Sequence, residues 1–177
     1  MLRRFWLVSI VTLLLLPAAV QAQFKQSDWE LTLTGTGANG PDFDGTSLSV
    51  GGSLGYFFTD QLEISLRQTL GFTDIGVSGN LNGSTRVALD YHFDLGRVGS
   101  FPAVVPFIGG EFGYVYGDAV NDSFEAGPEA GLKFFVNNTT FVFLSAEYQF
   151  FFNSGDDASN SFSDGQFIYS LGIGFRF

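Results

Sequence analysis

The sequence predicts an all-β fold, an eight-stranded antiparallel transmembrane β-barrel with a polar, filled interior, preceded by a cleaved signal peptide. Apolar and polar residues alternate along eight segments, as expected for strands whose two faces meet different environments. The composition agrees, because the chain has 22 Phe and 23 Gly but only 15% charged residues, against about 25% in a typical soluble domain. The N-terminal residues also have the pattern of an export signal.

Residues 1–22 have the pattern of a secretory signal peptide. Arg3 and Arg4 precede an apolar run at 5–16, Pro17 interrupts it, and residues 20–22 provide small side chains at the cleavage position. The apolar run is shorter than the roughly 20 residues that a spanning helix needs. We therefore expect removal of residues 1–22 and a single barrel domain over 23–177.

Eight segments follow, none with the spacing of an amphipathic helix. Each suits a tilted spanning strand of about 9–11 residues with short extensions. In order, their alternating apolar residues occupy 29–33, 48–58, 62–72, 87–93, 108–116, 124–136, 142–152 and 167–177. The first segment continues in small residues after Leu33, and the second alternates its apolar residues with Ser and Gly.

Long and short connections alternate between these segments. The long, polar and Gly-rich ones lie at 37–45, 74–84, 117–122 and 153–165, and the others lie at 59–61, 95–103 and 137–139. This alternation predicts longer loops at one end of the barrel and both chain termini at the other. Pro106 and Pro128 fall inside segments, and because proline removes a ladder donor we expect each near a strand end or a bulge.

The apolar face is predicted to meet lipid rather than a protein core. The opposite face is dominated by Gly, Ser and Thr, whereas a solvated surface carries about 25–35% charged residues. Aromatic residues gather at both ends of the apolar face, as in interfacial girdles. One level has Trp29, Phe58, Phe93, Phe134 and Phe175; the other has Phe72, Tyr114, Tyr116, Phe150, Phe152 and Phe167.

The same parity points most of the charged strand residues into the lumen. We assign ten of them to an interior ion network: Glu30, Glu63, Arg67, Arg86, Asp90, Glu111, Glu129, Lys133, Glu147 and Arg176. Asp94 and Glu125 share this parity, and the aromatic residues Phe57, Phe135, Phe143 and Phe151 also point inward. The interior of an eight-stranded barrel is filled by side chains, and buried charges need partners. The network is interpreted as a plug, with a proton- or cation-sensitive lumen as the alternative.

Hairpin geometry gives specific pairings. A turn centred on Asn138 puts Glu129 opposite Glu147, and a hairpin centred on Val120 puts Glu111 opposite Glu129. Three carboxylates would then share a row, which Lys133 and Arg67 are placed to reach. Two further pairs, Arg67 opposite Asp90 and Arg176 beside Glu30 at the closing seam, are also predicted.

The sequence offers little for catalysis, metal binding or nucleic acid. The chain has no cysteine and a single histidine, His92, which excludes thiolate chemistry and multi-histidine sites. A nucleophile, base and orienting group are not recognisable around His92, so we expect no catalytic, cofactor-binding or metal-binding residues and no cofactor. The net charge of −10 argues against nucleic acid. Asp156, Asp157 and Asp164 form an acidic loop that is interpreted as solvated charge, with weak Ca²⁺ binding as the alternative.

The C-terminal segment resembles the terminal signal of bacterial outer-membrane barrels, which their assembly machinery reads. It alternates apolar residues and ends in phenylalanine: Tyr169, Leu171, Ile173, Phe175 and Phe177. The stretches at 106–117 and 127–150 are similar to the small OmpA-like and OmpX-like barrel family. Full-length OmpA members continue into a peptidoglycan-binding domain, and here we expect the barrel domain without it. This resemblance implies a barrel in the outer membrane of a Gram-negative-type bacterium, in contact with its lipid and lipopolysaccharide.

Three functions follow as hypotheses. The first is a non-enzymatic outer-membrane barrel, expected to be monomeric, with a role in envelope integrity or surface interactions. The second is a narrow, porin-like channel for ions or small solutes. The third, disfavoured by the missing catalytic constellation, is a lipid-modifying enzyme.

Overall fold

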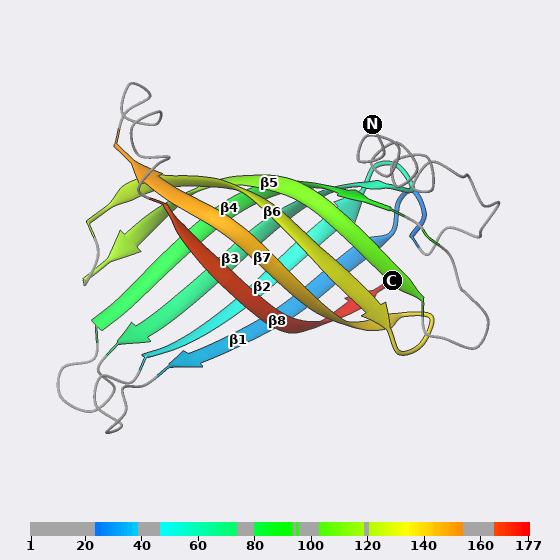
Figure 1. Cartoon of the computed structure of the whole chain (residues 1–177), viewed down its shortest axis with the longest axis horizontal. Coiled ribbons are helices and arrows are strands. Elements are labelled where there is room, and N and C mark those ends of the chain that lie inside the picture. The colour runs from blue at the N-terminus through cyan, green and yellow to red at the C-terminus, as the bar shows by residue number, and fades with distance from the viewer. Residues whose placement is uncertain are drawn as a thin grey trace, which may run out of the picture.

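A computed structural model of the chain contains a closed antiparallel barrel of eight strands (Figure 1). It describes residues 24–38, 47–73, 80–93, 95, 103–118, 121–153 and 165–177. The strands are β1 (Trp29–Ala38), β2 (Ser47–Phe57), β3 (Leu62–Thr73), β4 (Asn80–His92), β5 (Val104–Gly117), β6 (Ser123–Phe135), β7 (Thr140–Phe152) and β8 (Gln166–Arg176). Among the described residues, none forms a helix long and apolar enough to cross a membrane.

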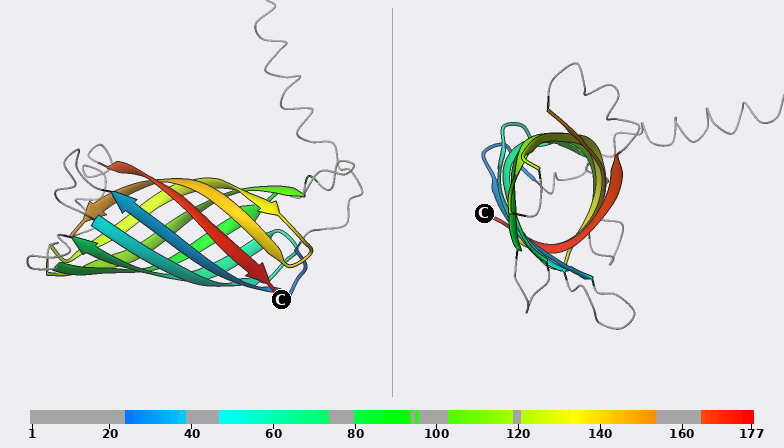
Figure 2. Two further views of the ribbon diagram at one scale, coloured as in Figure 1. Left: turned by 90° about the horizontal axis from the view of Figure 1, so that it is seen from below. Right: turned by 90° about the vertical axis from the view of Figure 1, so that its left-hand side faces the viewer.

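Each strand pairs with its sequence neighbours, and β1 pairs with β8 to close the ring. Figure 2 shows the ring end-on, and also shows the strands tilted against the barrel axis. At the closing seam Leu31 pairs with Phe175 and Leu33 with Ile173. Closure gives every strand two neighbours in the ring. The β1–β8 pairing covers Glu30–Thr34 and Gly172–Arg176, the half of the seam nearer the β6–β7 turn. The predicted fold class of a closed eight-stranded barrel is confirmed.

The register agrees with two predicted pairings and differs from two others. Glu129 faces Glu147, and Glu30 faces Arg176, as predicted. Glu111 faces Gly127 instead of Glu129, because the β5–β6 hairpin is centred one residue earlier than Val120 and this moves each partner by two positions. The prediction that Arg67 lies opposite Asp90 is also wrong, since Arg67 faces Arg86.

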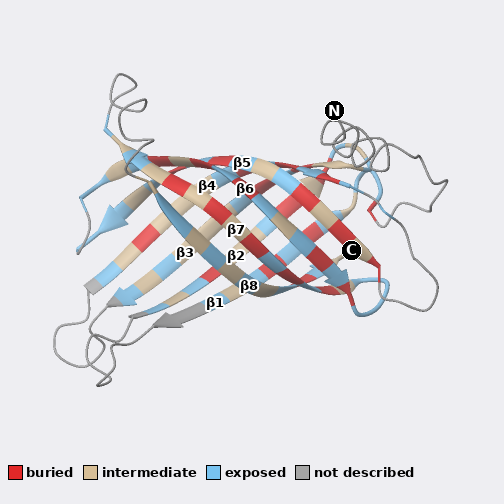
Figure 3. Ribbon diagram, in the orientation of Figure 1, coloured by how far each residue is buried: buried red, intermediate tan, exposed pale blue. Residues whose placement is uncertain are grey.

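The two faces of the sheet differ completely in charge. On the described strands, outward positions carry no Asp, Glu, Lys or Arg, and their large side chains are exposed, for example Leu66 at 56%, Ile108 at 52% and Leu144 at 50%. Most inward positions on the same strands are buried or half-buried, so that exposed residues alternate with buried or intermediate ones along the strands in Figure 3. The outer surface is therefore an apolar band around a polar interior.

Aromatic residues lie at both ends of this band. Near the end that carries the β2–β3 and β6–β7 turns, Trp29 packs on Tyr56 and Tyr91 on Phe93, with ring centroids 5.0 and 4.9 Å apart. At the opposite end Phe124 packs on Tyr114, with centroids 5.3 Å apart. These pairs lie where the sequence predicts interfacial girdles.

The two prolines behave differently. Pro106 is near the start of β5, as predicted. Pro128 lies inside β6 without a bulge, because the register is the same on either side of it: Ala126 pairs with Phe150 and Glu129 with Glu147. The β6–β7 pairing is interrupted at Gly127 and Pro128, and a Cβ at Gly127 would overlap the carbonyl oxygen of Tyr148.

We predict that Gly127→Ala lowers the free energy of unfolding by about 1–3 kcal/mol, because the added methyl group must displace backbone atoms of β7. The matched control is Gly110→Ala on β5, where a Cβ would lie at an ordinary 3.7 Å from the nearest carbonyl oxygen. That change should be neutral or stabilise by up to about 1 kcal/mol. Urea unfolding of both variants in lipid vesicles measures the difference, and equal effects would contradict the close approach at Gly127.

Candidate functional site

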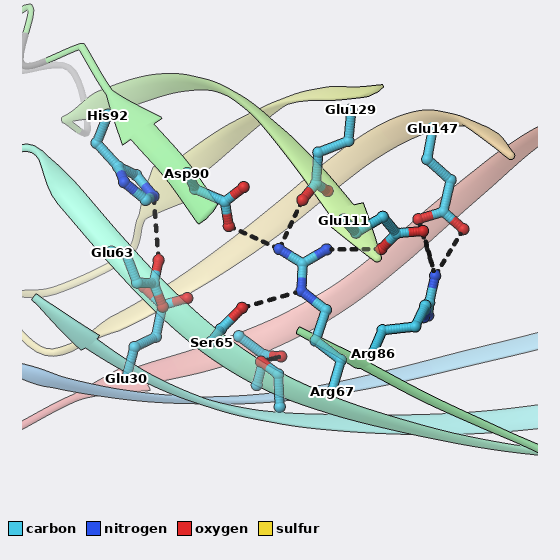
Figure 4. A network of polar contacts seen from close by, with 12 residues as sticks. Glu30, Glu63, Ser65, Arg67, Arg86, Asp90, His92, Glu111, Glu129 and Glu147 are labelled. Atoms are coloured by element: carbon cyan, nitrogen blue, oxygen red, sulfur yellow. Dashed lines mark hydrogen bonds and ion pairs between the residues drawn. The ribbon is translucent and has the colours of Figure 1, made fainter. Parts of the chain in front are cut away.

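The lumen is the candidate site, and its side chains are arranged in successive layers along the barrel axis. Figure 4 shows the charged layers, in which side chains from β1, β3, β4, β5, β6 and β7 meet inside the barrel. We describe them from the end with the tight β2–β3 and β6–β7 turns, called the turn end, toward the opposite end, called the loop end. All predicted network residues are on described strands.

An aromatic cluster closes the turn end. It contains Phe24, Ala103, Val105, Phe57, Phe135, Phe141 and Phe143, all buried. Phe24 lies before β1, is 1% exposed and stacks on Phe57 with ring centroids 4.2 Å apart. Its segment is anchored by the Ser27 N–H, which donates to the Phe57 carbonyl at 2.7 Å, and by the Gln26 N–H, which donates to Asp60 Oδ1 at 2.8 Å. The chain thus folds back into its own lumen.

Sequence reasoning placed Phe57, Phe135 and Phe143 inside, and the structure buries all three. It did not find Phe24, because this residue precedes the first alternating segment and no periodic pattern includes it. Phe151 is on the inward side of β7 but close to the loop end, where it is 37% exposed.

Lys133 forms the first charged layer above the aromatic cluster. Its Nζ donates to both carboxylate oxygens of Glu30 at 2.6 Å and to Glu63 Oε2 at 3.3 Å. Four phenylalanine rings surround the ammonium group at centroid distances of 5.0–5.9 Å: Phe24, Phe57, Phe107 and Phe141. Cation–π attraction adds to the two ion pairs in this buried environment. Lys133 therefore pairs across the lumen with β1 and β3, and not with the carboxylate row that the sequence suggested.

His92 borders the same layer. It is 1% exposed, its Nε2 lies 3.4 Å from Glu63 Oε2, and the rings of Phe24, Phe57 and Phe107 pack around it. This environment gives the imidazole no access to the outer surface of the barrel. Asp94, which shares the inward parity of His92, lies outside the described residues.

Arg67 forms the second layer. Its Nη2 lies 2.6 Å from Asp90 Oδ2 and 2.6 Å from Glu129 Oε1, and its Nη1 lies 3.5 Å from Glu111 Oε2. The Nε–H donates to Ser65 Oγ at 3.1 Å. Arg67 thus reaches Asp90 diagonally, despite the different register, and crosses from β3 to β6 to reach Glu129.

Arg86 forms the third layer. Its Nη1 donates to Glu111 Oε1 at 2.8 Å and to Glu147 Oε1 at 3.0 Å. Its Nε is 3.9 Å from Glu125 Oε1, whose carboxylate also accepts from Ser84 and, at 2.6 Å, from Gln149 Nε2. Because Glu111 contacts both guanidinium groups, it links the second and third layers.

Arg176 stands apart from these layers. It faces Glu30 in the register, but its guanidinium lies 3.4 Å from Asp28 and donates to the Asn138 carbonyl at 2.9 Å, at the turn end. The carboxylate row that the sequence predicted is also incomplete, since Glu129 faces Glu147 while Glu111 is offset by two positions.

Acidic groups outnumber basic groups in these layers. In the described lumen seven carboxylates are buried: Glu30, Glu63, Asp90, Glu111, Glu125, Glu129 and Glu147. They share Lys133, Arg67 and Arg86 as cationic partners. The described residues include no group of three or more side chains suited to hold a metal ion.

Two cavities remain in the lumen. A small one of about 70 Å³ lies among the charged layers and is lined by residues including Glu30, Asp90 and Glu129. A larger one of about 610 Å³ occupies the loop half, above Arg86, Glu125 and Glu147. The lumen is therefore filled at the turn end and centre and hollow toward the loop end.

Comparison with known proteins found similar structures but no matching sequences. No protein-family model matches the sequence, and no curated protein sequence matches it. The N-terminal β-barrel domain of Pseudomonas aeruginosa OprF is similar in structure, with 22% identity, a TM-score of 0.55, and coverage of 86% of this chain and 98% of that domain. The protein therefore has the same eight-stranded barrel fold as this domain.

A second similar structure is Neisserial surface protein A (NspA). It has 15% identity and a TM-score of 0.50, and the alignment covers 84% of this chain and 94% of NspA. At these identities the likeness shows the shared fold alone. The lumen chemistry described above therefore rests on the residues of this chain.

We predict that Lys133→Met lowers the free energy of unfolding by about 3–5 kcal/mol, because it leaves the buried carboxylates of Glu30 and Glu63 without their cation. The matched control is Lys25→Met, an exposed lysine at the same end of the barrel, which should change stability by about 0.5 kcal/mol or less. Adding Glu30→Gln to Lys133→Met should recover part of the loss. Equal effects of the two lysine variants in urea unfolding would contradict the assignment.

Proposed function

We propose that this protein is a non-enzymatic integral barrel of the bacterial outer membrane, with a role in envelope integrity or surface interactions. The observation that carries the proposal is the uncharged, exposed outer face of a closed barrel whose lumen is packed at one end and crossed by ion pairs. The loops that would make surface contacts lie mostly outside the described residues.

The outer face supports a lipid environment. Large aliphatic side chains are exposed around the barrel, for example Leu31 at 40%, Leu66 at 56% and Leu144 at 50%. In water, a continuous apolar surface of this size would drive aggregation. In a bilayer the same apolar surface is favourable because it faces lipid. A closed ring of strands also suits a bilayer, since its backbone groups hydrogen-bond to one another.

Three features support the bacterial outer membrane in particular. The predicted signal peptide directs export, and the fold is similar to those of the OprF barrel domain and NspA. The apolar residues of β8 and Phe177 face outward, with Phe177 68% exposed, as a strand read by barrel-assembly machinery would require. We infer that the partners are outer-membrane lipid, lipopolysaccharide and that machinery, and that the closed barrel is a monomer.

The filled lumen favours a structural role over a channel. A solute moving along the axis would have to displace three layers of buried ion pairs and the aromatic cluster around Phe24. Breaking a buried pair costs several kcal/mol. The acidic excess and the cavity at the loop end favour the channel as the second candidate, because they would admit cations to half of the lumen.

The environment of His92 opposes a lipid-modifying enzyme. Its side chain is enclosed by phenylalanine rings in the lumen, whereas lipid substrates would meet the outer face. Lipid A mass profiles from deletion and wild-type cells test this alternative, and a changed profile that depends on His92 would overturn the non-enzymatic proposal.

We predict that Leu144→Arg, on the outward face of β7, lowers the free energy of unfolding in lipid vesicles by about 2–4 kcal/mol, since it puts a charge at bilayer depth. The matched control is Val136→Arg in the β6–β7 turn, which is 65% exposed and should cost about 0–1 kcal/mol. Equal costs, or a mature protein that stays soluble without detergent and shows no heat-dependent gel shift, would overturn the membrane proposal.

We also predict that the refolded barrel gives no discrete openings in a planar bilayer at neutral or acidic pH, because the ion-pair layers and aromatic cluster block the axis. Single-channel recording measures this, with heat-dependent gel mobility as the control for folding. Reproducible openings from folded protein would instead support the channel, and a pH response would implicate the carboxylates around Arg67 and Arg86.

A further inference from the structure

The cavity at the loop half of the lumen has the size of a small-molecule site. Its volume is about 610 Å³, within the roughly 300–1,000 Å³ of known ligand pockets. It is built on strands rather than on loops, and residues from all eight strands line it. We call it the vestibule. Its walls are paired strands of the barrel, except at the seam between β1 and β8, where the pairing covers only Glu30–Thr34 and Gly172–Arg176.

The accessible wall of the vestibule is neutral. Its charged residues, Arg86, Glu125 and Glu147, lie at the floor, where their side chains are 12%, 1% and 7% exposed. Above them, hydroxyl and amide side chains are partly or fully exposed, among them Thr69, Ser84, Asn121, Ser123, Gln166 and Ser170. These groups both donate and accept hydrogen bonds.

The floor charges are already committed to one another. Arg86 contacts Glu147 and Glu125, and Glu125 also accepts from Ser84 and Gln149. An anionic ligand would have to displace Glu147 or Glu125 from Arg86 or remain unpaired beside these carboxylates, and both outcomes are unfavourable. A neutral ligand leaves the floor intact.

One side of the vestibule is apolar. Phe151 on β7 points inward with 37% of its surface exposed, and Ile168 on the adjacent β8 lines the same cavity. The exposed aromatic ring and the aliphatic side chain give a surface for the apolar side of a ligand. Hydroxyl and amide groups of β1–β4, among them Thr34, Ser49 and Thr69, also line the vestibule.

We propose that the vestibule binds a neutral amphipathic small molecule, which places its hydroxyl or amide groups on the polar wall and its apolar side on Phe151 and Ile168. The inference goes beyond the proposed envelope role and does not depend on it. Because the ion-pair layers and the aromatic cluster close the lumen below, the vestibule is a blind pocket: the ligand enters and leaves at the loop end.

Saturation-transfer NMR on the full mature barrel tests this in lipid nanodiscs, which avoid detergents that have sugar headgroups. The probe is phenyl β-glucoside, which combines an uncharged polyol with an aromatic side. Phenyl glucuronide has the same shape and an added carboxylate, and glucose lacks the apolar side. We expect phenyl β-glucoside to bind at least about tenfold more tightly than either analogue.

Adjacent phenylalanines on β7 provide the matched variants. Phe151→Ala removes the apolar wall and should weaken phenyl β-glucoside binding about tenfold, whereas Phe152→Ala removes an equal side chain from the outward face and should change it less than about twofold. Ile168→Ala provides a second test of the same wall and should also weaken binding. Heat-dependent gel mobility establishes that each variant is folded.

Three results would overturn the proposal. Absence of phenyl β-glucoside binding by the folded wild type would mean that the vestibule holds solvent alone. Equal binding of the glucuronide would contradict the neutral wall. Equal effects of Phe151→Ala and Phe152→Ala, or no effect of Phe151→Ala and Ile168→Ala, would place binding elsewhere.

Discussion

Closure of the hydrogen-bonded ladder between β1 and β8 is the constraint on which the rest of the structure depends. Once the ring is closed, successive side chains on every strand must point alternately outward and into a narrow lumen. The outward set is uncharged and the inward set includes seven carboxylates. One residue of slip in any strand would exchange the two sets, so the chemistry of both faces holds the register in place.

The inward set then creates its own requirement. Carboxylates crowded into a filled lumen are costly unless cations lie close to them. Arg67 and Arg86 have planar groups that contact several carboxylates at once, while Lys133 holds Glu30 and Glu63 with one compact ammonium group. Because Glu111 contacts both guanidinium groups, the layers form a connected network, and a change at one layer is expected to affect its neighbour.

The two ends of the lumen differ because their side chains differ. Large phenylalanines and the folded-back Phe24 fill the turn end, whereas glycine, serine and threonine at the inward positions of β1–β4 leave the loop half hollow. The barrel wall is similar at both ends, so the asymmetry comes from side-chain volume. A lumen filled at the turn end and hollow at the loop end fits the proposed structural role and the proposed blind pocket.

Period-two alternation, read along the sequence, predicted the strand number and which residues share a face, such as Glu30, Arg86 and Lys133, because strand geometry dictates this. The aromatic girdles and the charge-poor polar face then assigned that shared face to the lumen, and the need to satisfy backbone hydrogen bonds in a bilayer predicted the closed sheet. The alternation did not determine the β5–β6 register. Moving the centre of that hairpin by one residue changes the partner of Glu111 by two positions, from Glu129 to Gly127. The alternation gave no sign of Phe24, which precedes it. Only the tertiary structure decided which charges meet: Lys133 and Glu30 are 103 residues apart, and the curvature and tilt of the closed barrel bring their strands to face each other across the lumen.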